Sequence, residues 1–400
     1  MANRPLLSPP RLRPSPWEEL HTTWLELFYD LVVAVAVTQA AIPLSGVLSR
    51  TVISLFFGLF LLVWWVWSGH TVYTTRFETD DTLYVLLAFA QMLAVVGIAV
   101  AIPQIGLGNT RGFGIAYLAS RLILLVLLAR AWYYVVETRQ LMRIYLTGFG
   151  VGAGIWAASL FFQPPAQFVL WGISLTIDLL TPWVVWGTVP PSSEVNPTHI
   201  PERLATFTII VLGLSVAIVV RSLTNTPMAL ETAMGAVLGF LITACLWWTY
   251  YQHLDRAIGR IHLRSGQPYI YSHFPLLIGI VMIGAGIGRA IIANQQVHLS
   301  PGTLALLWGG FGAWLLGGFL LHVASQYPED TRSGVYKIGR YYAVTAGAAA
   351  IVVTLSLYPL LTPLTSLGVL LVFIIVHLWF DSRRHLARMT VRADERVNDR

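Results

Sequence analysis

Long apolar segments alternate with short polar breaks along almost the whole 400-residue chain. Each apolar segment is long enough to cross the hydrocarbon core of a bilayer, about 30 Å thick, as a helix. Helices are required because lipid cannot hydrogen-bond an open backbone. The breaks are rich in proline and glycine, the residues that end helices. The pattern predicts twelve membrane-spanning helices, at about residues 24–44, 51–73, 82–102, 113–134, 143–162, 167–187, 204–222, 229–251, 273–293, 303–323, 339–358 and 363–380.

The composition agrees with a membrane protein and excludes several other classes. Apolar residues make up 56% of the chain and charged residues 11%, whereas a soluble domain carries about 25% charged residues. Mean hydropathy is +0.68. The single cysteine, Cys245, excludes a disulfide within the chain and a cysteine–metal cluster. We therefore predict an all-α integral membrane protein without a metal or other cofactor, whose partners are membrane lipids.

The distribution of basic residues predicts the orientation in the membrane. If the N-terminus is cytoplasmic, 19 of the 25 Lys and Arg residues lie on the cytoplasmic side and four on the opposite side, and the other two fall within the fourth span. Because cytoplasmic loops carry the excess of Lys and Arg, both termini are predicted to be cytoplasmic. The basic residues are dispersed, so we expect no nucleic-acid partner. Residues 1–23 are predicted to be a disordered tail without a cleaved signal peptide, and residues 382–400 a basic tail.

The chain also contains a weak internal repeat, as many transporters and channels do. The repeat divides it into two six-helix halves, residues 24–187 and 202–381, joined by a polar, proline-rich linker at 188–201. Six spans per half is an even number, so the halves are predicted to be parallel. The matched positions are Glu26 with Glu202, Asp30 with Thr206, and the pair Trp64-Trp65 with Trp247-Trp248.

Two carboxylates at the start of the first span are the main candidates for a functional site. Glu26 and Asp30 are four residues apart and share one face of a helix. An acidic residue at mid-membrane costs roughly 2.5–3.5 kcal/mol. A cation or proton site here predicts an aqueous vestibule reaching both carboxylates, with Val33 and Val37 continuing the face as an apolar gate. The alternative is a structural role, in which the carboxylates cap the helix or pair with Arg76, Arg121 or Arg143.

Three other polar features have a structural and a functional interpretation. Arg121, within the fourth span, is expected to pair with Asp178 of the sixth span. The structural interpretation is an ion pair that specifies the fold. The functional interpretation is that the pair binds an anionic lipid headgroup or gates a path. The histidines favour interfacial hydrogen bonds over haem or metal ligation, and His273 is kept as a possible proton relay. Arg256, Arg260 and Arg264 recur every four residues and favour binding of anionic lipid headgroups.

Glycine-rich stretches in two predicted helices indicate close packing. Gly148, Gly150, Gly152 and Gly154 resemble a dinucleotide-binding fingerprint only superficially, because no strand precedes them. Close helix–helix contact explains them better, as it does Gly284-x-x-x-Gly288.

The sequence Glu26-Leu27-Phe28-Tyr29-Asp30-Leu31-Val32, followed by Thr38-Gln39, resembles the opening signature of the bacterial low-temperature-requirement A (LtrA) family. The resemblance continues in order through about residues 20–380, including the stretch from Pro201 to Ser215. The family usually has a glutamate where this chain has Leu214. The family name implies a multi-pass membrane location and a link to growth in the cold, and it does not imply an activity.

The stretch Phe28-Tyr29-Asp30 also resembles the first-helix signature of the lysosomal and bacterial potassium/proton channels, which have serine in place of Tyr29. In those channels the first helix of each six-helix repeat lines the pore. The resemblance therefore implies that the first and seventh spans line a path. The positions in the seventh span that correspond to Val33 and Val37 are Ile209 and Gly213.

These observations lead to a hypothesis and two alternatives. The hypothesis is a bacterial inner-membrane protein that moves a small ion, a cation or a proton, across the membrane. The first alternative is an integral-membrane enzyme or redox protein that acts on a lipid or quinone. The second is a non-catalytic envelope factor for growth in the cold.

Overall fold

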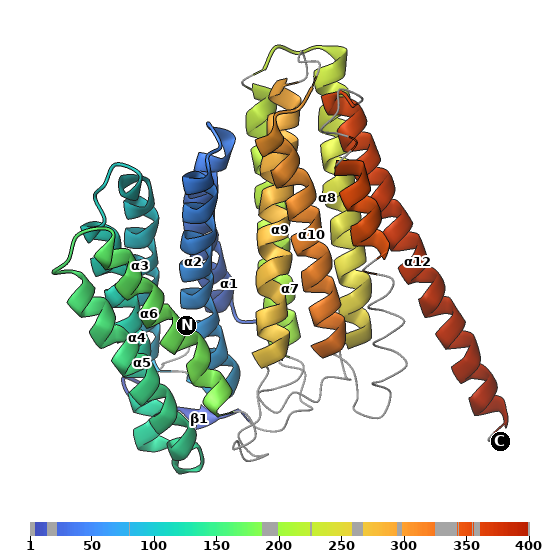
Figure 1. The fold of residues 1–400 in the computed structure, drawn as a ribbon. Helices are drawn as coiled ribbons and strands as arrows, with labels where there is room; N and C mark the ends of the chain where they lie inside the picture. The colour runs from blue at the N-terminus through green and yellow to red at the C-terminus, as the bar shows by residue number, and fades with distance from the viewer. Residues whose placement is uncertain are drawn as a thin grey trace. The chain divides into compact units, whose positions relative to one another are not determined.

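The computed structural model describes residues 5–13, 22–79, 81–185, 199–224, 226–257, 267–293, 298–324, 342, 344–353, 355 and 361–398, with side chains left out at 253–257 and 381–398. Within this part of the chain, eleven helices are long and apolar enough to cross a membrane. The prediction of an all-α, multi-pass membrane protein is confirmed. Its elements are shown in Figure 1.

The elements follow one another in a simple order. Two short strands and two 3-10 turns lie among the helices. In chain order the elements are β1 (Arg11–Leu12), α1 (Trp24–Ala41), η1 (Ile42–Ser45), α2 (Arg50–Arg76), β2 (Phe77–Glu78), α3 (Thr82–Ile105), α4 (Arg111–Tyr134), η2 (Val136–Thr138), α5 (Arg139–Ser159), α6 (Ala166–Val184), α7 (His199–Thr224), α8 (Leu230–Ala257), α9 (Gln267–Ile292), α10 (Pro301–Ala324) and α12 (Pro363–Asn398).

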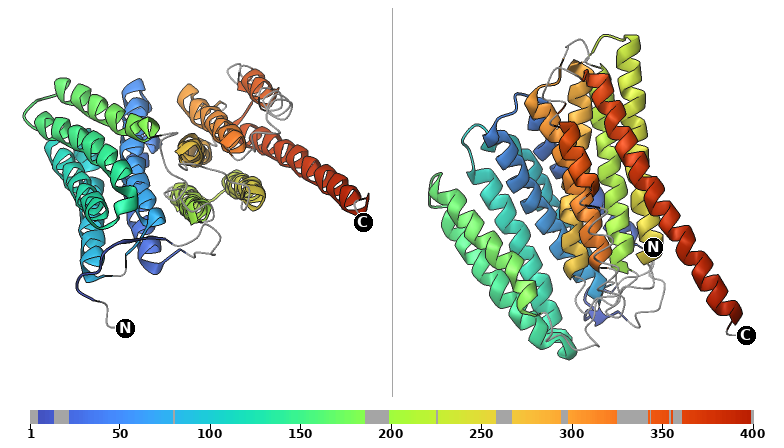
Figure 2. Two further views of the ribbon diagram at one scale, coloured as in Figure 1. Left: turned by 90° about the horizontal axis from the view of Figure 1, so that it is seen from below. Right: turned by 45° about the vertical axis from the view of Figure 1, so that its right-hand side comes forward.

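Eleven of the twelve predicted windows coincide with these helices to within a few residues at most ends. The remaining window, 339–358, lies partly outside the described residues. The helix described there, Val344–Val353, is shorter than a membrane span, so a twelfth span stays a prediction. The predicted basic tail continues α12, which runs unbroken to Asn398 (Figure 2).

The chain divides into two compact units. Unit 1 comprises residues 1–210 and 261–274, and unit 2 comprises residues 211–260 and 275–400. The helices α7 and α9 each contribute residues to both units. The two parallel repeats with a linker at 188–201 remain a prediction.

In unit 1 the helices pack mainly against their neighbours in sequence. The pairs α3 with α4, α4 with α5 and α5 with α6 lie side by side, and α1 packs against both α2 and α3 (Figure 1). Large aromatic side chains fill the space between these helices, and Trp64, Trp67 and Trp156 are fully buried. In a membrane, close van der Waals packing of this kind holds the helices together, because lipid provides no hydrophobic driving force between them.

The N-terminal segment is ordered where the structure describes it, so the prediction of a disordered tail is wrong for residues 5–13. The strand β1 pairs antiparallel with β2. The backbone N–H of Ser8 donates to Asp81 Oδ2 at 3.2 Å, and the N–H of Arg13 donates to the Arg76 carbonyl at 3.1 Å. The prolines and arginines suggested a solvated tail, but the short extended strand satisfies its backbone against the end of α2.

Glycines allow helices to approach closely in both units. Gly148 and Gly152 lie against Thr181 and Asp178 of α6, where a Cβ atom would collide with those side chains. In unit 2, a Cβ on Gly284 would lie 2.8 Å from the Cβ of Ser215. The interpretation as helix-packing positions is therefore confirmed for Gly148, Gly152, Gly284 and Gly288. It is wrong for Gly150 and Gly154, because a Cβ atom there would have no neighbour within 4 Å. In the same unit α12 lies beside α8.

The close approach of α9 and α10 at Gly279 generates a prediction. A Cβ atom on Gly279 would lie 2.6 Å from the carbonyl oxygen of Gly310 and 2.6 Å from the backbone nitrogen of Trp314. Because backbone atoms cannot rotate away, Gly279→Ala is expected to destabilise unit 2 by about 1–3 kcal/mol. Gly312→Ala is the matched control, because a Cβ there would have no neighbour within 4 Å. Thermal unfolding in detergent should show a lower midpoint for Gly279→Ala alone, and equal midpoints would contradict the packing described.

Candidate functional site

The helix α1 begins with a capping box that uses Glu26. The side chain of Thr23 accepts a hydrogen bond from the N–H of Glu26, and Glu26 Oε2 accepts the N–H of Thr23 at 2.8 Å. Such a reciprocal pair satisfies two backbone donors at the start of a helix. Glu26 therefore has a structural role at the mouth of the span, as one of the two alternatives predicted.

Glu26 is also the acidic member of a small buried cluster. Its side chain lies next to two groups from elsewhere in unit 1. His199 Nε2 of α7 is 3.7 Å from Oε2, and Arg13 Nη2 is 4.0 Å from Oε1. Glu26 is 2% exposed and His199 is buried. A carboxylate at this depth is held by nearby positive or protonatable groups, as buried charges require.

Asp30, one turn further along α1, forms a two-point ion pair with Arg203 of α7. Arg203 Nη1 donates to Asp30 Oδ2 at 2.9 Å, and Arg203 Nη2 donates to Oδ1 at 2.8 Å. The indole Nε1 of Trp67 donates to Oδ1 at 2.7 Å. Asp30 and Arg203 are both 0% exposed. A two-point arginine–carboxylate contact of this kind is both strong and geometrically specific.

Aromatic rings enclose the ion pair. Trp67 stacks on Phe207 of α7, with ring centroids 4.3 Å apart and an angle of 17°. On the neighbouring face of α1, Tyr29 stacks on the buried imidazole of His70 at 4.2 Å. These contacts hold the first turns of α7, which belong to unit 1, against α1 and α2.

Two expectations about these carboxylates are overturned by this geometry. The predicted partners Arg76, Arg121 and Arg143 are wrong, because Asp30 pairs with Arg203 and Glu26 lies near His199 and Arg13. The predicted vestibule is wrong for the described structure, because protein atoms cover both carboxylates. The reason is that the start of α7 occupies the space into which the two side chains point.

The remaining polar residues of α1 and α7 bond mainly within their own helices. Thr38 Oγ1 donates to the Ala34 carbonyl at 2.7 Å, and Thr206 Oγ1 donates to the Glu202 carbonyl at 2.9 Å. Glu202 Oε1 accepts the N–H of Thr22 at 3.1 Å, which ties the start of α1 to α7. Gln39 is half-buried. Their roles in a transport path remain predictions.

The four candidate gate residues lie in different environments. Val33 and Val37 are fully buried in unit 1, on the face of α1 that carries Asp30. Ile209 is 50% exposed, and Gly213 is exposed. Ile209 and Gly213 are therefore not on the buried face of α7, which carries Arg203 and Phe207. Exposed residues of this kind cannot form an apolar gate within unit 1.

Arg121 and Asp178 are brought together as expected. Arg121 Nη2 of α4 lies 2.6 Å from Asp178 Oδ1 of α6, and both side chains are buried. The guanidinium carbon lies 4.9 Å from the centre of the Phe149 ring. This contact is a cation–π interaction, which adds to the ion pair. The predicted pairing is therefore confirmed, and a role in headgroup binding or gating stays a prediction.

The remaining predicted site residues are His273 and the three arginines Arg256, Arg260 and Arg264. His273 is buried in α9, where its Nδ1 donates to the Tyr269 carbonyl at 2.7 Å. Within the described residues, no group of three or more His, Cys, Asp or Glu side chains could hold a metal ion. Of the predicted headgroup-binding residues, Arg260 and Arg264 lie outside the described residues, and the side chain of Arg256 is not described.

Sequence reasoning missed the two residues of α7 that face the carboxylates. Neither Arg203 nor His199 was predicted to be a site residue. A signal was nevertheless present in their spacing. His199 and Arg203 are four residues apart, as Glu26 and Asp30 are, so each pair forms one face of its helix. The acidic face of α1 and the basic face of α7 therefore have complementary charges where the two helices pack together.

Two comparisons with known proteins bear on the chain. A family model described as "Bacterial low temperature requirement A protein (LtrA)" matches residues 21–378. An uncharacterized protein of Rhizobium meliloti (strain 1021) is 25% identical over 329 residues, which cover 73% of this chain and 78% of that protein. The chain is thus similar to both along most of its length.

The ion pair predicts an unusual pattern of stabilities. Asp30→Leu leaves the Arg203 charge buried without its counter-ion, which should cost about 3–5 kcal/mol. The double substitution Asp30→Leu/Arg203→Met removes both charges and should restore most of this stability. Thermal unfolding of the three proteins in one detergent measures the effect. If the double variant is as unstable as the sum of the two single variants, the two side chains do not act as a pair.

Proposed function

This chain belongs to the bacterial low temperature requirement A (LtrA) family, and we propose that it moves protons across the bacterial inner membrane through the cluster that joins α1 to α7. The cluster consists of Glu26, Asp30, His199 and Arg203. The observation that supports the proposal is the fully buried, two-point contact between Asp30 and Arg203.

The energetics of buried charge favour a functional reason for this contact. Replacing a buried ion pair by well-packed apolar residues is often neutral or stabilising. A membrane protein therefore gains little stability from such a pair. Ionisable residues inside membrane spans usually mark proton relays or substrate pathways. Asp30 and Arg203 meet this description, since both lie in membrane-spanning helices and both are covered by protein.

A proton suits the cluster better than a hydrated metal cation. Each Asp30 carboxylate oxygen already accepts at least one hydrogen bond, from Arg203 or Trp67. A cation would need to displace these donors, whereas a proton only needs a carboxylate or imidazole to accept it. Glu26 and His199, one turn toward the start of α1, supply two further groups that bind protons.

Proton binding would also change the contact between the two helices. A protonated Asp30 would no longer balance the charge of Arg203, which would then lose the carboxylate that it contacts at two points. Because an uncompensated buried charge is costly, the protein would favour a second arrangement of the first turns of α7. Alternation between these arrangements would carry protons past the cluster without an open pore. The Leu214 and Thr206 positions of α7, where the chain lacks carboxylates, need no acidic side chain in this scheme.

Proton flux into liposomes tests the proposal. The purified full chain is reconstituted with a trapped pH-sensitive dye, and a pH gradient and a membrane potential are imposed. Wild-type protein should dissipate the gradient, and Asp30→Asn should lose at least about tenfold in rate, as expected when a positioned acid–base group is removed. Asp81→Asn is the matched control, because Asp81 is also a buried carboxylate that pairs with an arginine, Arg130, but lies outside the cluster.

The double variant Asp30→Leu/Arg203→Met separates transport from a structural role. The proposal expects it to fold and to conduct no protons. If the double variant conducts protons as fast as wild type, the ion pair only specifies the fold. If the wild-type protein itself conducts no protons, the proposal is wrong.

A further inference from the structure

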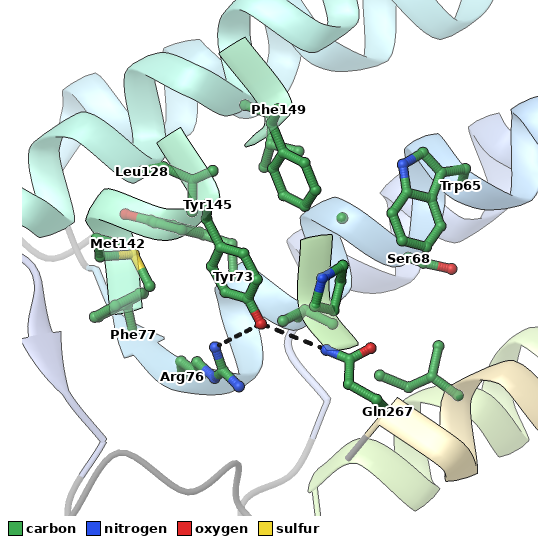
Figure 3. Close-up of a pocket in the computed structure, with 15 residues that line it drawn as sticks. Trp65, Ser68, Tyr73, Arg76, Phe77, Leu128, Met142, Tyr145, Phe149 and Gln267 are labelled. Atoms are coloured by element: carbon green, nitrogen blue, oxygen red, sulfur yellow. Dashed lines mark hydrogen bonds between the residues drawn. The ribbon is translucent and has the colours of Figure 1, made fainter. Parts of the chain in front are cut away.

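A cavity in unit 1, separate from the cluster of α1 and α7, has a charged end and apolar walls. It lies between side chains of α2, α4, α5, α6 and the first turn of α9. Figure 3 shows Arg76, Tyr145 and Gln267 gathered at one end of it. Most of the other lining residues are apolar and include Trp65, Leu124, Leu128, Met142, Phe149 and Ile270.

The charged end is formed by Arg76, the last residue of α2. Arg76 is 3% exposed. Its Nη1 donates to Tyr145 Oη at a long distance of 3.4 Å, and its Nε and Nη2 have no hydrogen-bond partner among the described residues. Nor does any described carboxylate form a salt bridge with it. A buried guanidinium without a counter-ion is costly unless something else supplies the negative charge.

Tyr145 and Gln267 converge on the same end of the cavity. Gln267 Nε2 donates to Tyr145 Oη at 3.5 Å, so this oxygen accepts from both Gln267 and Arg76 (Figure 3). The hydroxyl proton of Tyr145 therefore remains available to donate to a ligand. Together with the two unpartnered guanidinium nitrogens, it forms a set of donors without an acceptor.

Comparison with Arg121 shows what is missing at Arg76. The rings of Tyr145 and Phe149, one turn apart on α5, are stacked with centroids 5.3 Å apart. Arg76 lies over the Tyr145 ring at 5.6 Å, and Arg121 lies over the Phe149 ring at 4.9 Å. Arg121 receives the carboxylate of Asp178. Arg76 has the same kind of aromatic partner but no carboxylate partner among the residues that the structure describes, so this position can accept the anion of a ligand.

We propose that this cavity binds an amphiphilic anion, with its carboxylate or phosphate on Arg76 and Tyr145 and its apolar chain against the aromatic walls. A guanidinium fork matches either group by two parallel hydrogen bonds. The apolar lining selects against small inorganic anions, which would leave the walls uncovered. A free fatty acid and an anionic phospholipid share this chemistry.

Binding to the full-length protein, purified in a neutral detergent, tests the site. Native mass spectrometry would follow titration with three probes: decanoate, the uncharged decanol, and phosphatidylglycerol. Wild-type protein should bind decanoate or phosphatidylglycerol at least about tenfold more tightly than decanol, because a hydrogen bond to a charged group is the main contribution lost. Saturation by decanoate alone identifies a free carboxylate as the ligand, and saturation by phosphatidylglycerol identifies a lipid headgroup.

Two variants locate the binding. Arg76→Gln should weaken anion binding about tenfold or more, and Tyr145→Phe, which keeps the ring, about two- to tenfold. Arg143→Gln is the matched control, because it removes the same charge from an exposed position on α5. Without ligand, Arg76→Gln should unfold at the same or a higher temperature than wild type, since it removes an unpaired buried cation.

Three results would overturn the proposal. These are equal binding of decanol and the anions, an unchanged affinity in both Arg76→Gln and Tyr145→Phe, and an equal loss in Arg143→Gln. If Arg76→Gln fails to fold, Tyr145→Phe decides the question alone.

Discussion

The contact between Asp30 and Arg203 is the interaction on which the candidate site depends. It joins two helices whose contacting residues are 173 positions apart in sequence. Both charges are removed from solvent, so neither can be changed without affecting the other. The surrounding rings and the capping box at the start of α1 hold the pair in one geometry. A charge pair of this kind adds little stability beyond that of apolar residues, which is why we relate it to proton movement.

Three buried arginines in unit 1 illustrate how the same side chain serves different purposes. Arg203 and Arg121 each meet an aspartate from another helix. Arg76 lines a cavity and contacts the phenol of Tyr145, and no acidic residue in the described part of the chain pairs with it. Because the cost of burying a guanidinium is similar in the three places, the missing partner at Arg76 is informative. The protein supplies its own counter-ion twice and leaves the third position for a ligand.

The fold could be predicted from sequence to the extent that it depends on local properties. Crossing a bilayer requires only a certain length of apolar helix, so the spans and most of their ends follow from hydropathy and from proline and glycine. The pairing of Arg121 with Asp178 was also predictable, because few charged residues are available in the middle of the spans. The partner of Asp30 was not, because the choice among several arginines depends on how α7 packs against α1. The order of residues 5–13 was missed for a similar reason, since β1 forms only through contacts with the end of α2.

The most direct test of the central claim is whether Asp30 itself takes up a proton. Infrared difference spectroscopy of the reconstituted protein, recorded as the pH is lowered, detects the carbonyl band of a newly protonated carboxyl group. The account predicts a band that appears on acidification, is absent in Asp30→Asn, and persists in Asp81→Asn. A spectrum in which Asp30 contributes no band at any pH at which the protein moves protons would contradict it.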